Sequence, residues 1–389
     1  LAASMENREE VKGEWKKYQQ GQSGDAEQLF ESLEGKGTGW CTAGKSTAET
    51  QIENGDFYVY YTNDSNGEPT QPRLAIRMEG DNRIGEVRGI LPHQGVEPIM
   101  QEALDAKLQD FGGEADAYRK KSGDMKILTA LDQKREQDEP FTKDDLVFLY
   151  EINSSIEGFG YQTDPRIAEL RKGRNTEEDM LVIFECTKED IAHVPSQITK
   201  DTKAYVGQLE PGIFQKLPEG LEHVYTSFPE KKIRRESVEI GGKTTEQLIA
   251  EMEAAHINIS DYAKSMMKNR DFIPGKTREE ATLIRLTVAD LGFKTSATTD
   301  QIYERAQTLG LELCPPDTGP NYRLKYKDQP LNEWVRIGMK QIADSDGDPD
   351  VFSLGRGGDG LWLISLWAEP DDAWRPDGGF VFRLRKSES

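Results

Sequence analysis

The sequence has 389 residues, of which 31% are charged and 35% hydrophobic, and its formal net charge is -21. This composition predicts a soluble globular protein of two or three domains. No apolar run is long enough to span a bilayer. Because a strongly negative protein repels phosphate backbones and anionic membranes, we expect a protein partner rather than nucleic acid or a membrane.

The cysteines and histidines predict no metal site. Cys41, Cys186 and Cys314 lie far apart, and an odd number of cysteines without CxxC spacing favours a reducing, cytoplasmic compartment. The four histidines are equally scattered, so no Cys/His group has the spacing of a zinc site. We therefore expect no metal and no cofactor. The opening LAASMENREE has no signal-peptide pattern, and because it starts with Leu an upstream segment stays open.

The first predicted domain, residues 1–160, combines helices with a small sheet. Residues 5–34 have the spacing of two polar helices. Three β runs then predict a three-stranded antiparallel meander over 56–62, 72–78 and 84–90. Helical spacing returns over 97–122, 125–137 and 141–156, and the last of these helices opens on a capping box formed by Thr142 and Asp145.

The second predicted domain, residues 161–243, is a small α/β unit. The apolar run MLVIFE predicts a short buried strand over 180–185, and further short strands are expected over 203–207 and 222–228. The basic cluster KKIRRE at 231–236 carries no interleaved aromatic residue. We interpret it as a solvated turn or strand edge rather than a nucleic-acid contact.

The third predicted domain, residues 244–389, places helices before an antiparallel sheet. Helical patterns cover 244–256, 260–269, 277–293 and 298–313, and we interpret the last two as a helical hairpin rather than a DNA-binding helix-turn-helix. Five strand candidates follow, at 321–326, 333–342, 350–356, 360–367 and 380–386. The fold class is therefore multi-domain α+β: N-terminal helices with a meander, a small middle α/β unit, and a C-terminal helical hairpin with an antiparallel sheet.

The segment GWCTAGKS, Gly39 to Ser46, matches the phosphate-loop pattern through Gly39, Gly44, Lys45 and Ser46. A working phosphate loop needs a buried strand before it and a long helix after it. Here the preceding residues have helical spacing, and the following ones allow about two helical turns before the strand at Asp56. We interpret the motif as a chance match and leave nucleotide binding as an alternative.

Cys41 is a candidate catalytic thiol, because a cysteine just before a helix start is activated by the helix dipole. No histidine is near it in sequence, although His93 could approach it in space. The competing interpretation is that Trp40 and Cys41 are packing residues beside the meander, and we favour it.

Two features of the C-terminal part raise the question of a ligand-binding site. The segment DSDGDPD, Asp344 to Asp350, has carboxylates at alternate positions, but its Gly is misplaced for a calcium loop and we expect a polar hairpin turn. Four tryptophans suggest stacking on a ligand, but we expect core packing instead: Trp334, Trp362, Trp367 and Trp374.

Residues 39–89 resemble PcfJ-like proteins, which are associated with conjugative plasmids, phages and other mobile elements. The shared pattern runs through WCTAG, AETQIENG, DFYVYY, PRLAIRM and IGEVRG: a Cys with a small-residue turn, a short helix, and three strands of which the last ends in Arg-Gly. Trp40 stands where a His often precedes the Cys, so a Cys–His pair is not implied here. The resemblance implies a link to mobile elements and no settled activity.

The C-terminal part also resembles a module of uncharacterised bacterial proteins, through LGLELCPP, YRLKYKDQP, EWVRIGMKQI and FVFRLRK. This resemblance implies a bacterial cytoplasmic protein. We therefore expect a non-catalytic interaction or accessory protein linked to mobile elements. The alternative is an enzyme centred on Gly39 to Ser46, acting as an NTPase through Lys45 and Ser46 or as a thiol enzyme through Cys41.

Overall fold

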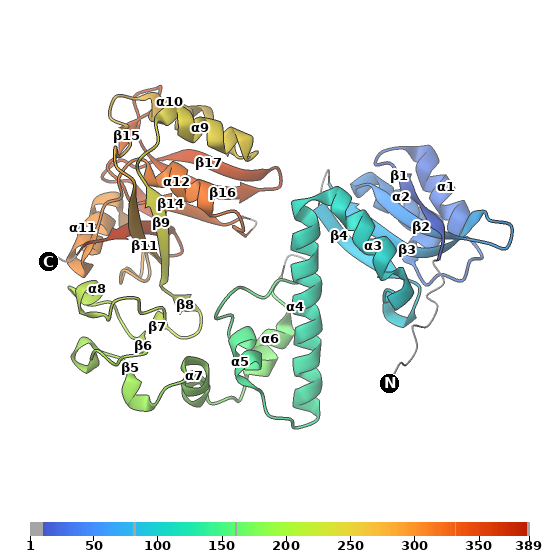
Figure 1. The fold of residues 1–389 in the computed structure, drawn as a ribbon, viewed down its shortest axis with the longest axis horizontal. Helices are drawn as coiled ribbons and strands as arrows, with labels where there is room; N and C mark the ends of the chain where they lie inside the picture. The colour runs from blue at the N-terminus through green and yellow to red at the C-terminus, as the bar shows by residue number, and fades with distance from the viewer. Residues whose placement is uncertain (1–10, 81–82, 160–161, 331, 387–389) are drawn as a thin grey trace, which may run out of the picture. The chain divides into compact units, whose positions relative to one another are not determined.

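The computed structural model describes residues 11–80, 83–159, 162–330 and 332–386. The chain divides into two compact units, Leu1–Arg174 and Asn175–Ser389, which we call the N-terminal and C-terminal units (Figure 1). Each unit combines helices with sheets that are largely antiparallel. The expected α+β, multi-domain fold class is confirmed.

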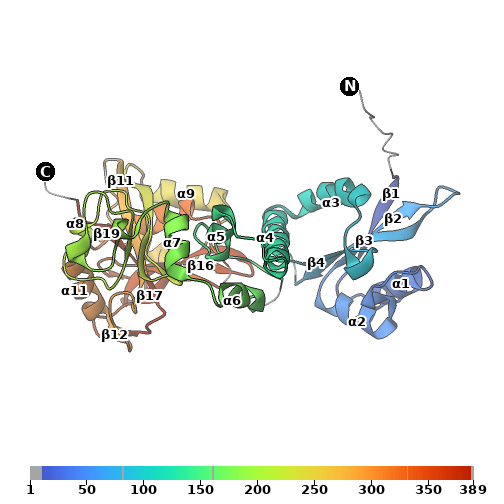
Figure 2. The same ribbon diagram turned by 90° about the horizontal axis from the view of Figure 1, so that it is seen from below.

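The N-terminal unit is built on one antiparallel sheet with helices on both faces. Its strand order is β1 (Gly13–Tyr18), β2 (Phe57–Asn63), β3 (Pro69–Glu79) and β4 (Arg83–Gly89). Helices α1 (Ser23–Leu33) and α2 (Lys45–Asn54) lie on one face, and α3 (Gln101–Leu108) lies on the other (Figure 2). Successive side chains of β2 point to opposite faces of the sheet, since Val59 packs with α1 and α2 while Tyr60 packs with α3.

The expectation of two helices over residues 5–34 is wrong for the residues that the structure describes. Only α1 is helical there, and β1 pairs with β2 from Gly13↔Thr62 to Tyr18↔Phe57, so the meander has a fourth strand. Two neighbouring lysines hide β1 from a search for strands. Lys16 and Lys17 are typical of a sheet edge, where charge discourages pairing with another chain.

The helical part of the N-terminal unit differs from expectation in where its helices break. The helix expected over 97–122 is interrupted, because α3 ends at Leu108 and a 3₁₀ turn leads to Gly112, whose φ of +55° suits glycine. Helix α4 (Gly113–Glu136) follows without a break. Helices α5 (Lys143–Leu149) and α6 (Pro165–Arg171) pack against it through Leu128, Leu131, Leu149, Ile167 and Leu170. The capping box of Thr142 and Asp145 is confirmed.

The C-terminal unit is built on a mixed sheet, nine-stranded in its described residues. Its main path runs β10-β17-β16-β14-β19-β11-β9, with β13 added to β19 and β15 added to β16. The bounds are β9 (Arg234–Ile240), β10 (Asn258–Ile259), β11 (Glu279–Thr287), β13 (Leu311–Glu312), β14 (Trp334–Ile337), β15 (Ile342–Ala343), β16 (Pro349–Gly357), β17 (Gly360–Trp367) and β19 (Gly379–Leu384).

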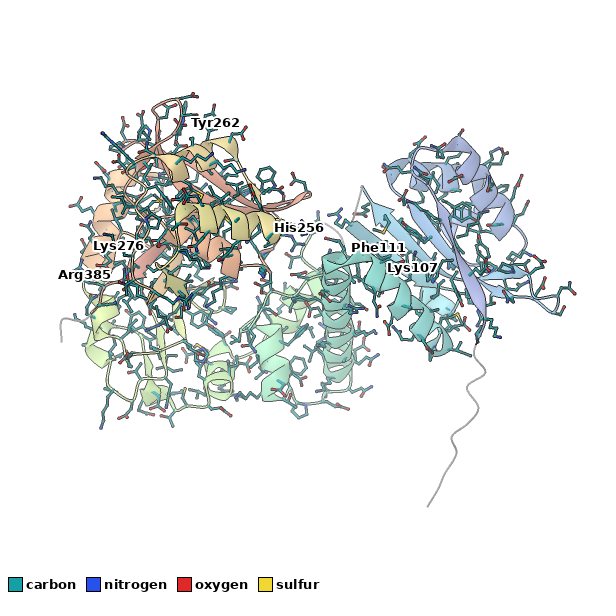
Figure 3. All side chains as sticks on the ribbon, turned by 45° about the horizontal axis from the view of Figure 1, so that its top comes forward. Lys107, Phe111, His256, Tyr262, Lys276 and Arg385 are labelled. Atoms are coloured by element: carbon teal, nitrogen blue, oxygen red, sulfur yellow. The ribbon has the colours of Figure 1, made fainter. Side chains whose placement is uncertain are left out.

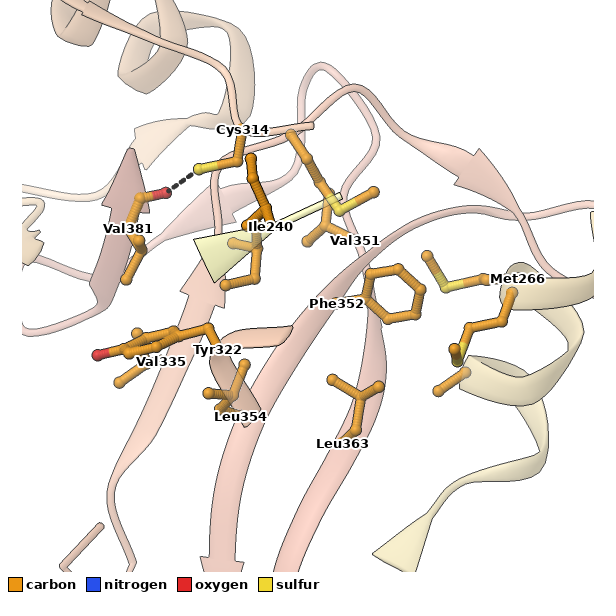
Figure 4. Packing of buried hydrophobic residues seen from close by; sticks show 14 of the residues in the cluster. Ile240, Met266, Cys314, Tyr322, Val335, Val351, Phe352, Leu354, Leu363 and Val381 are labelled. Carbon is orange, nitrogen blue, oxygen red and sulfur yellow. Dashed lines mark hydrogen bonds between the residues drawn. The ribbon is translucent and has the colours of Figure 1, made fainter. Parts of the chain in front are cut away.

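One apolar cluster of this unit joins the sheet to three helices, α9 (Thr245–Ala254), α10 (Asp261–Lys268) and α12 (Thr318–Lys325). Figure 4 shows Phe352 and Leu363 of the sheet near Met266 of α10, and Cys314 directed at the carbonyl of Val381. A second cluster includes residues of α11 (Thr299–Leu309) and α8 (Ile213–Lys216). Two small sheets complete the unit: β5 (Ile191–Ala192), β6 (Ala204–Val206), β7 (Val224–Ser227) and β8 (Lys231–Lys232); and β12 (Ala297–Thr298) with β18 (Ala373–Trp374).

Two expectations for this unit are wrong because strongly apolar runs have no decisive period. Residues 180–184 are not a strand but belong to α7 (Thr176–Phe184), which is capped by Asn175, and Glu185 follows the helix with a φ of +51°. Residues 277–293 are not a capped helix, since β11 pairs with both β19 and β9. Leu283 and Ile284 enter opposite apolar clusters, so this strand is buried on both faces. The hairpin expected from 277–293 and 298–313 is therefore wrong, since only its second part, α11, is helical.

Two further differences concern the C-terminal strands and the domain boundaries. Residues 321–325 lie in α12 and Tyr326 directly follows it, whereas β16, β17 and β19 occupy three of the five expected strand positions. The stretch 333–342 is split into β14 and β15. The boundary expected at 243/244 does not separate two bodies, because β9 pairs with β11 along Glu279↔Ile240 to Arg285↔Arg234.

Candidate functional site

The segment Gly39 to Ser46 does not have the framework of a phosphate loop. No strand lies between the end of α1 at Leu33 and the short 3₁₀ turn at Cys41–Ala43, and the sheet beside it is antiparallel. Gly44 is the residue before α2, which is ten residues long. The Lys45 ammonium lies 3.3 Å from the exposed Glu27 carboxylate, so it is engaged in a surface ion pair.

Trp40 and Cys41 have different roles. Trp40 is buried, and its indole N–H donates to the carbonyl of Gly89 at 2.7 Å. Cys41 is exposed, and its Sγ lies 3.2 Å from Nη1 of Arg88. The two neighbouring residues therefore join the segment to the end of β4. The packing interpretation fits Trp40 but not Cys41.

Arg88 is the residue beside Cys41 that sequence analysis missed. Its side chain is buried, its Nη2 lies 2.7 Å from the Glu86 carboxylate, and its Nε has no hydrogen-bond partner. Burial opposes the charge, but the hydrogen bonds to Glu86 and Cys41 outweigh it and raise the pKa of Arg88. The Arg-Gly end of IGEVRG was the available signal. His93 is exposed in the 92–94 turn, and in the described chain no hydrogen bond links it to Cys41.

The other candidate site is an open pocket of about 440 Å³ in the C-terminal unit. Its size is within the usual range for a small-ligand site. We call it the aspartate pocket, because four of its lining residues are aspartates. The residues that line it are Tyr262, Asp344, Asp346, Asp348, Asp350, Ser365, Leu366, Trp367 and Trp374. Figure 3 labels Tyr262, which lies on α10.

The DSDGDPD segment is a tight polar turn between β15 and β16, as the sequence predicted. Oδ1 of Asp344 accepts the backbone N–H groups of Asp346 at 2.8 Å and Asp348 at 3.0 Å. Gly347 adopts a φ of +90°, which glycine tolerates without strain. The Asp344 N–H also donates to the carbonyl of Asp348 at 3.0 Å, so both the carboxylate and the backbone of Asp344 hold the turn in shape.

Helix α10 fixes the turn from the side. Ser265 Oγ accepts the N–H of Ser345 at 3.0 Å, and Asn269 Nδ2 donates to the carbonyl of Ala343 at 2.9 Å. The Tyr262 hydroxyl donates to Asp346 Oδ2 at 3.0 Å, and this bond raises the pKa of Tyr262. The pocket wall is therefore held by side chains of α10 as well as by the turn itself.

Asp350 is the pocket residue whose position is least expected. It is only 2% exposed, and its Oδ1 has no hydrogen-bond partner. Burial raises its pKa, with smaller contributions from Asp344 and Asp348, while a hydrogen bond with Ser365 opposes the shift. Burial therefore disfavours the ionised form of Asp350, and a cation placed beside this carboxyl group would stabilise that form.

Aromatic rings lie beside these carboxylates. Trp367 is 64% exposed and is the register partner of Asp350 in the β16–β17 ladder, so the two side chains point to the same face. Trp374 is held by its indole N–H, which donates to Thr299 Oγ1 at 2.8 Å. The expectation that the tryptophans are core residues is therefore wrong for Trp367 and also for Trp334, which is 40% exposed. The sequence could not show that Trp367 would lie beside Asp350.

The described residues contain no group of three or more His, Cys, Asp or Glu side chains placed to hold a metal ion. In the same part of the chain, no helix is both long and apolar enough to cross a bilayer. Comparisons with protein-family models, with curated proteins and with solved structures return no match for this chain.

Proposed function

We propose that this protein is a non-catalytic interaction or accessory protein that binds a partner protein through the aspartate pocket. The observation that carries this proposal is the pocket itself, where the exposed Trp367 lies beside the buried Asp350 carboxyl group, one oxygen of which has no hydrogen-bond partner. Exposed aromatic residues next to fixed charge are typical of protein recognition sites. The acidic chain makes nucleic acid a poor candidate for the occupant.

The setting of this function is proposed from the sequence resemblances. Similarity to PcfJ-like proteins supports a link to mobile genetic elements, and the C-terminal resemblance supports a bacterial cytoplasmic protein. Both resemblances rest on short segments, 39–89 and four stretches after residue 308, and neither includes Asp350 or Trp367. The proposed pocket function is therefore independent of them.

We expect Trp367→Ala to abolish recovery of a specific partner from a bacterial lysate, because removing the exposed ring takes away the main apolar contact of the pocket. Affinity capture with the wild-type protein and the variant, followed by mass spectrometry, measures this. Trp334→Ala is the matched control, since Trp334 is also exposed, at 40%, and does not line the pocket. Equal recovery with Trp367→Ala and the wild type, or no recovery by either, contradicts the proposal.

A second candidate function is thiol chemistry at Cys41. The observation that favours it is the 3.2 Å contact between an exposed thiol and the buried Arg88 guanidinium, since a fixed cation stabilises a thiolate. If Cys41 is activated, iodoacetamide should alkylate Cys41 at pH 7 about tenfold faster than it alkylates the thiol of free glutathione. Peptide mapping with the buried Cys314 as an internal control measures the rate. Alkylation of Cys41 at or below the glutathione rate removes this candidate.

A further inference from the structure

The negative charge of the aspartate pocket is available to a ligand. Of its carboxylates, Asp344 is engaged by two backbone N–H groups and Asp346 by the Tyr262 hydroxyl. Asp350 is different, because its Oδ1 is enclosed and has no partner. A buried acceptor without a donor is expected to gain most from a ligand that supplies one.

We propose that the aspartate pocket binds the cationic head of a lysine or arginine side chain from a partner protein. The proposal rests on the function given above and adds the chemistry of the contact. The ammonium or guanidinium lies in the negative field of Asp344 and Asp348 and next to the buried Asp350 carboxyl group. The methylene stem of the same side chain packs on the exposed ring of Trp367, as long cationic side chains commonly do on apolar surface.

The pocket is better suited to an organic cation than to a metal ion. A calcium site surrounds one ion with six to eight oxygen ligands at short distance, whereas the described acidic side chains form no such group. The volume of about 440 Å³ and the lining by Leu366, Trp367 and Trp374 leave room for carbon atoms as well as charge. A hydrated or bare cation would make no use of these apolar walls.

A guanidinium of the protein itself already lies over one of the aromatic rings that line the pocket. The Arg336 guanidinium lies 4.6 Å from the ring centroid of Trp374, within the range of a cation–π contact. This arginine belongs to β14 and does not line the pocket. Its position is an example, within the same unit, of the contact that we propose for the incoming side chain on Trp367.

A side chain of a protein is favoured over a free amine by the depth of Asp350. Asp350 is 2% exposed, whereas Trp367, which also lines the pocket, is 64% exposed. A lysine or arginine side chain spans this difference with its methylene stem and leaves its backbone outside. A free polyamine provides the same cationic chemistry, so the test includes one.

The test is a calorimetric titration of the full chain with acetylated, amidated Gly-Lys-Gly and Gly-Arg-Gly peptides at low salt. Spermidine, CaCl₂ and the uncharged Gly-norleucine-Gly peptide are compared under the same conditions. We expect the two cationic peptides to bind and the norleucine peptide, which keeps the apolar stem, not to bind. Asp350→Asn should weaken peptide binding by about 30-fold, because it removes the charge that the ligand would pair with.

Asp328→Asn is the matched control, since it removes the same charge from an exposed position of the same unit that does not line the pocket. It should leave the affinity within about twofold. Binding of norleucine equal to lysine, binding of CaCl₂ alone, or unchanged affinity in Asp350→Asn overturns the inference. Binding of spermidine without either peptide keeps the cationic chemistry but contradicts a protein partner. Trp367-dependent capture of a partner without any cation binding keeps the proposed function and removes this inference.

Discussion

Replacing Arg323 with alanine should lower the free energy of unfolding of the C-terminal unit by about 4 kcal/mol. The Arg323 side chain on α12 is fully buried. Nη1 donates to Gln329 Oε1 and, at 3.2 Å, to the carbonyl of Gly355 in β16, while Nη2 donates to the carbonyl of Tyr326. Alanine would leave these acceptors without donors and open a cavity beneath the helix.

The effect is expected to be large although the charge itself is unfavourably placed. Burial lowers the pKa of Arg323 to about 10, because the guanidinium is held mainly by neutral oxygens. Those oxygens belong to the backbone and to Gln329, and they stay buried when the arginine is removed. The penalty of unpaired acceptors therefore outweighs the relief of removing a buried cation.

Hydrogen exchange of β16 and β17 peptides, together with urea unfolding, measures this loss. Arg270→Ala is the control, since the Arg270 side chain is 94% exposed, and it should change the free energy of unfolding by at most about 0.5 kcal/mol. A loss below 1 kcal/mol in Arg323→Ala, with exchange in β16 unchanged, would mean that the buried contacts do not hold α12 to the sheet.

Asp350→Asn should raise the free energy of unfolding at pH 7 by about 1 kcal/mol while it weakens binding of a cationic ligand. The pKa of Asp350 is raised in the folded state, chiefly by burial. A raised carboxyl pKa favours folding below the ordinary pKa of about 3.9, and this contribution is lost as the pH rises through the folded-state value. Ionisation of Asp350 above that value places a charge in a buried position, and asparagine avoids this cost.

The stability difference between Asp350→Asn and the wild type should grow from about pH 4 upward and then level off, since the wild-type carboxyl loses its proton over that interval. Urea midpoints at several pH values measure this trend. Asp328→Asn, at an exposed position, should show no such trend. A lower free energy of unfolding for Asp350→Asn than for the wild type at pH 7 would mean that the buried Asp350 side chain stabilises the fold. The pocket would then gain nothing from a cation beside Asp350.

The features that the sequence predicted correctly include some that depend only on residues close together in the chain. The capping box at Thr142 and the turn at Asp344 depend on residues within a few positions of each other. By contrast, β11 is buried on both faces and lacks a period that would separate strand from helix, so its pairing with β9 and β19 decides its conformation. The edge strand β1 was hidden for the opposite reason, because its lysines resemble a polar helix face.

The candidate site shows the same division between local and distant signals. The aspartates of the DSDGDPD turn and the tryptophans after it were each recognised as unusual, but as separate features. Their meeting is set by the register of β16 with β17, which places Asp350 opposite Trp367, and by α10, which brings Tyr262 from about eighty residues earlier in the chain. Burial of Asp350 depends on all three elements, so no sequence window could have revealed its unpaired oxygen.

The most direct measurement of the central claim is elution of captured partner from the immobilised full-length chain. If the aspartate pocket holds a cationic side chain, millimolar acetylated Gly-Lys-Gly amide should release the partner, because it competes for Asp350. The norleucine peptide, which differs only in the charged group, should leave the partner bound. Release by both peptides at the same concentration, or by neither, would contradict the claim that this pocket recognises its partner through a cation.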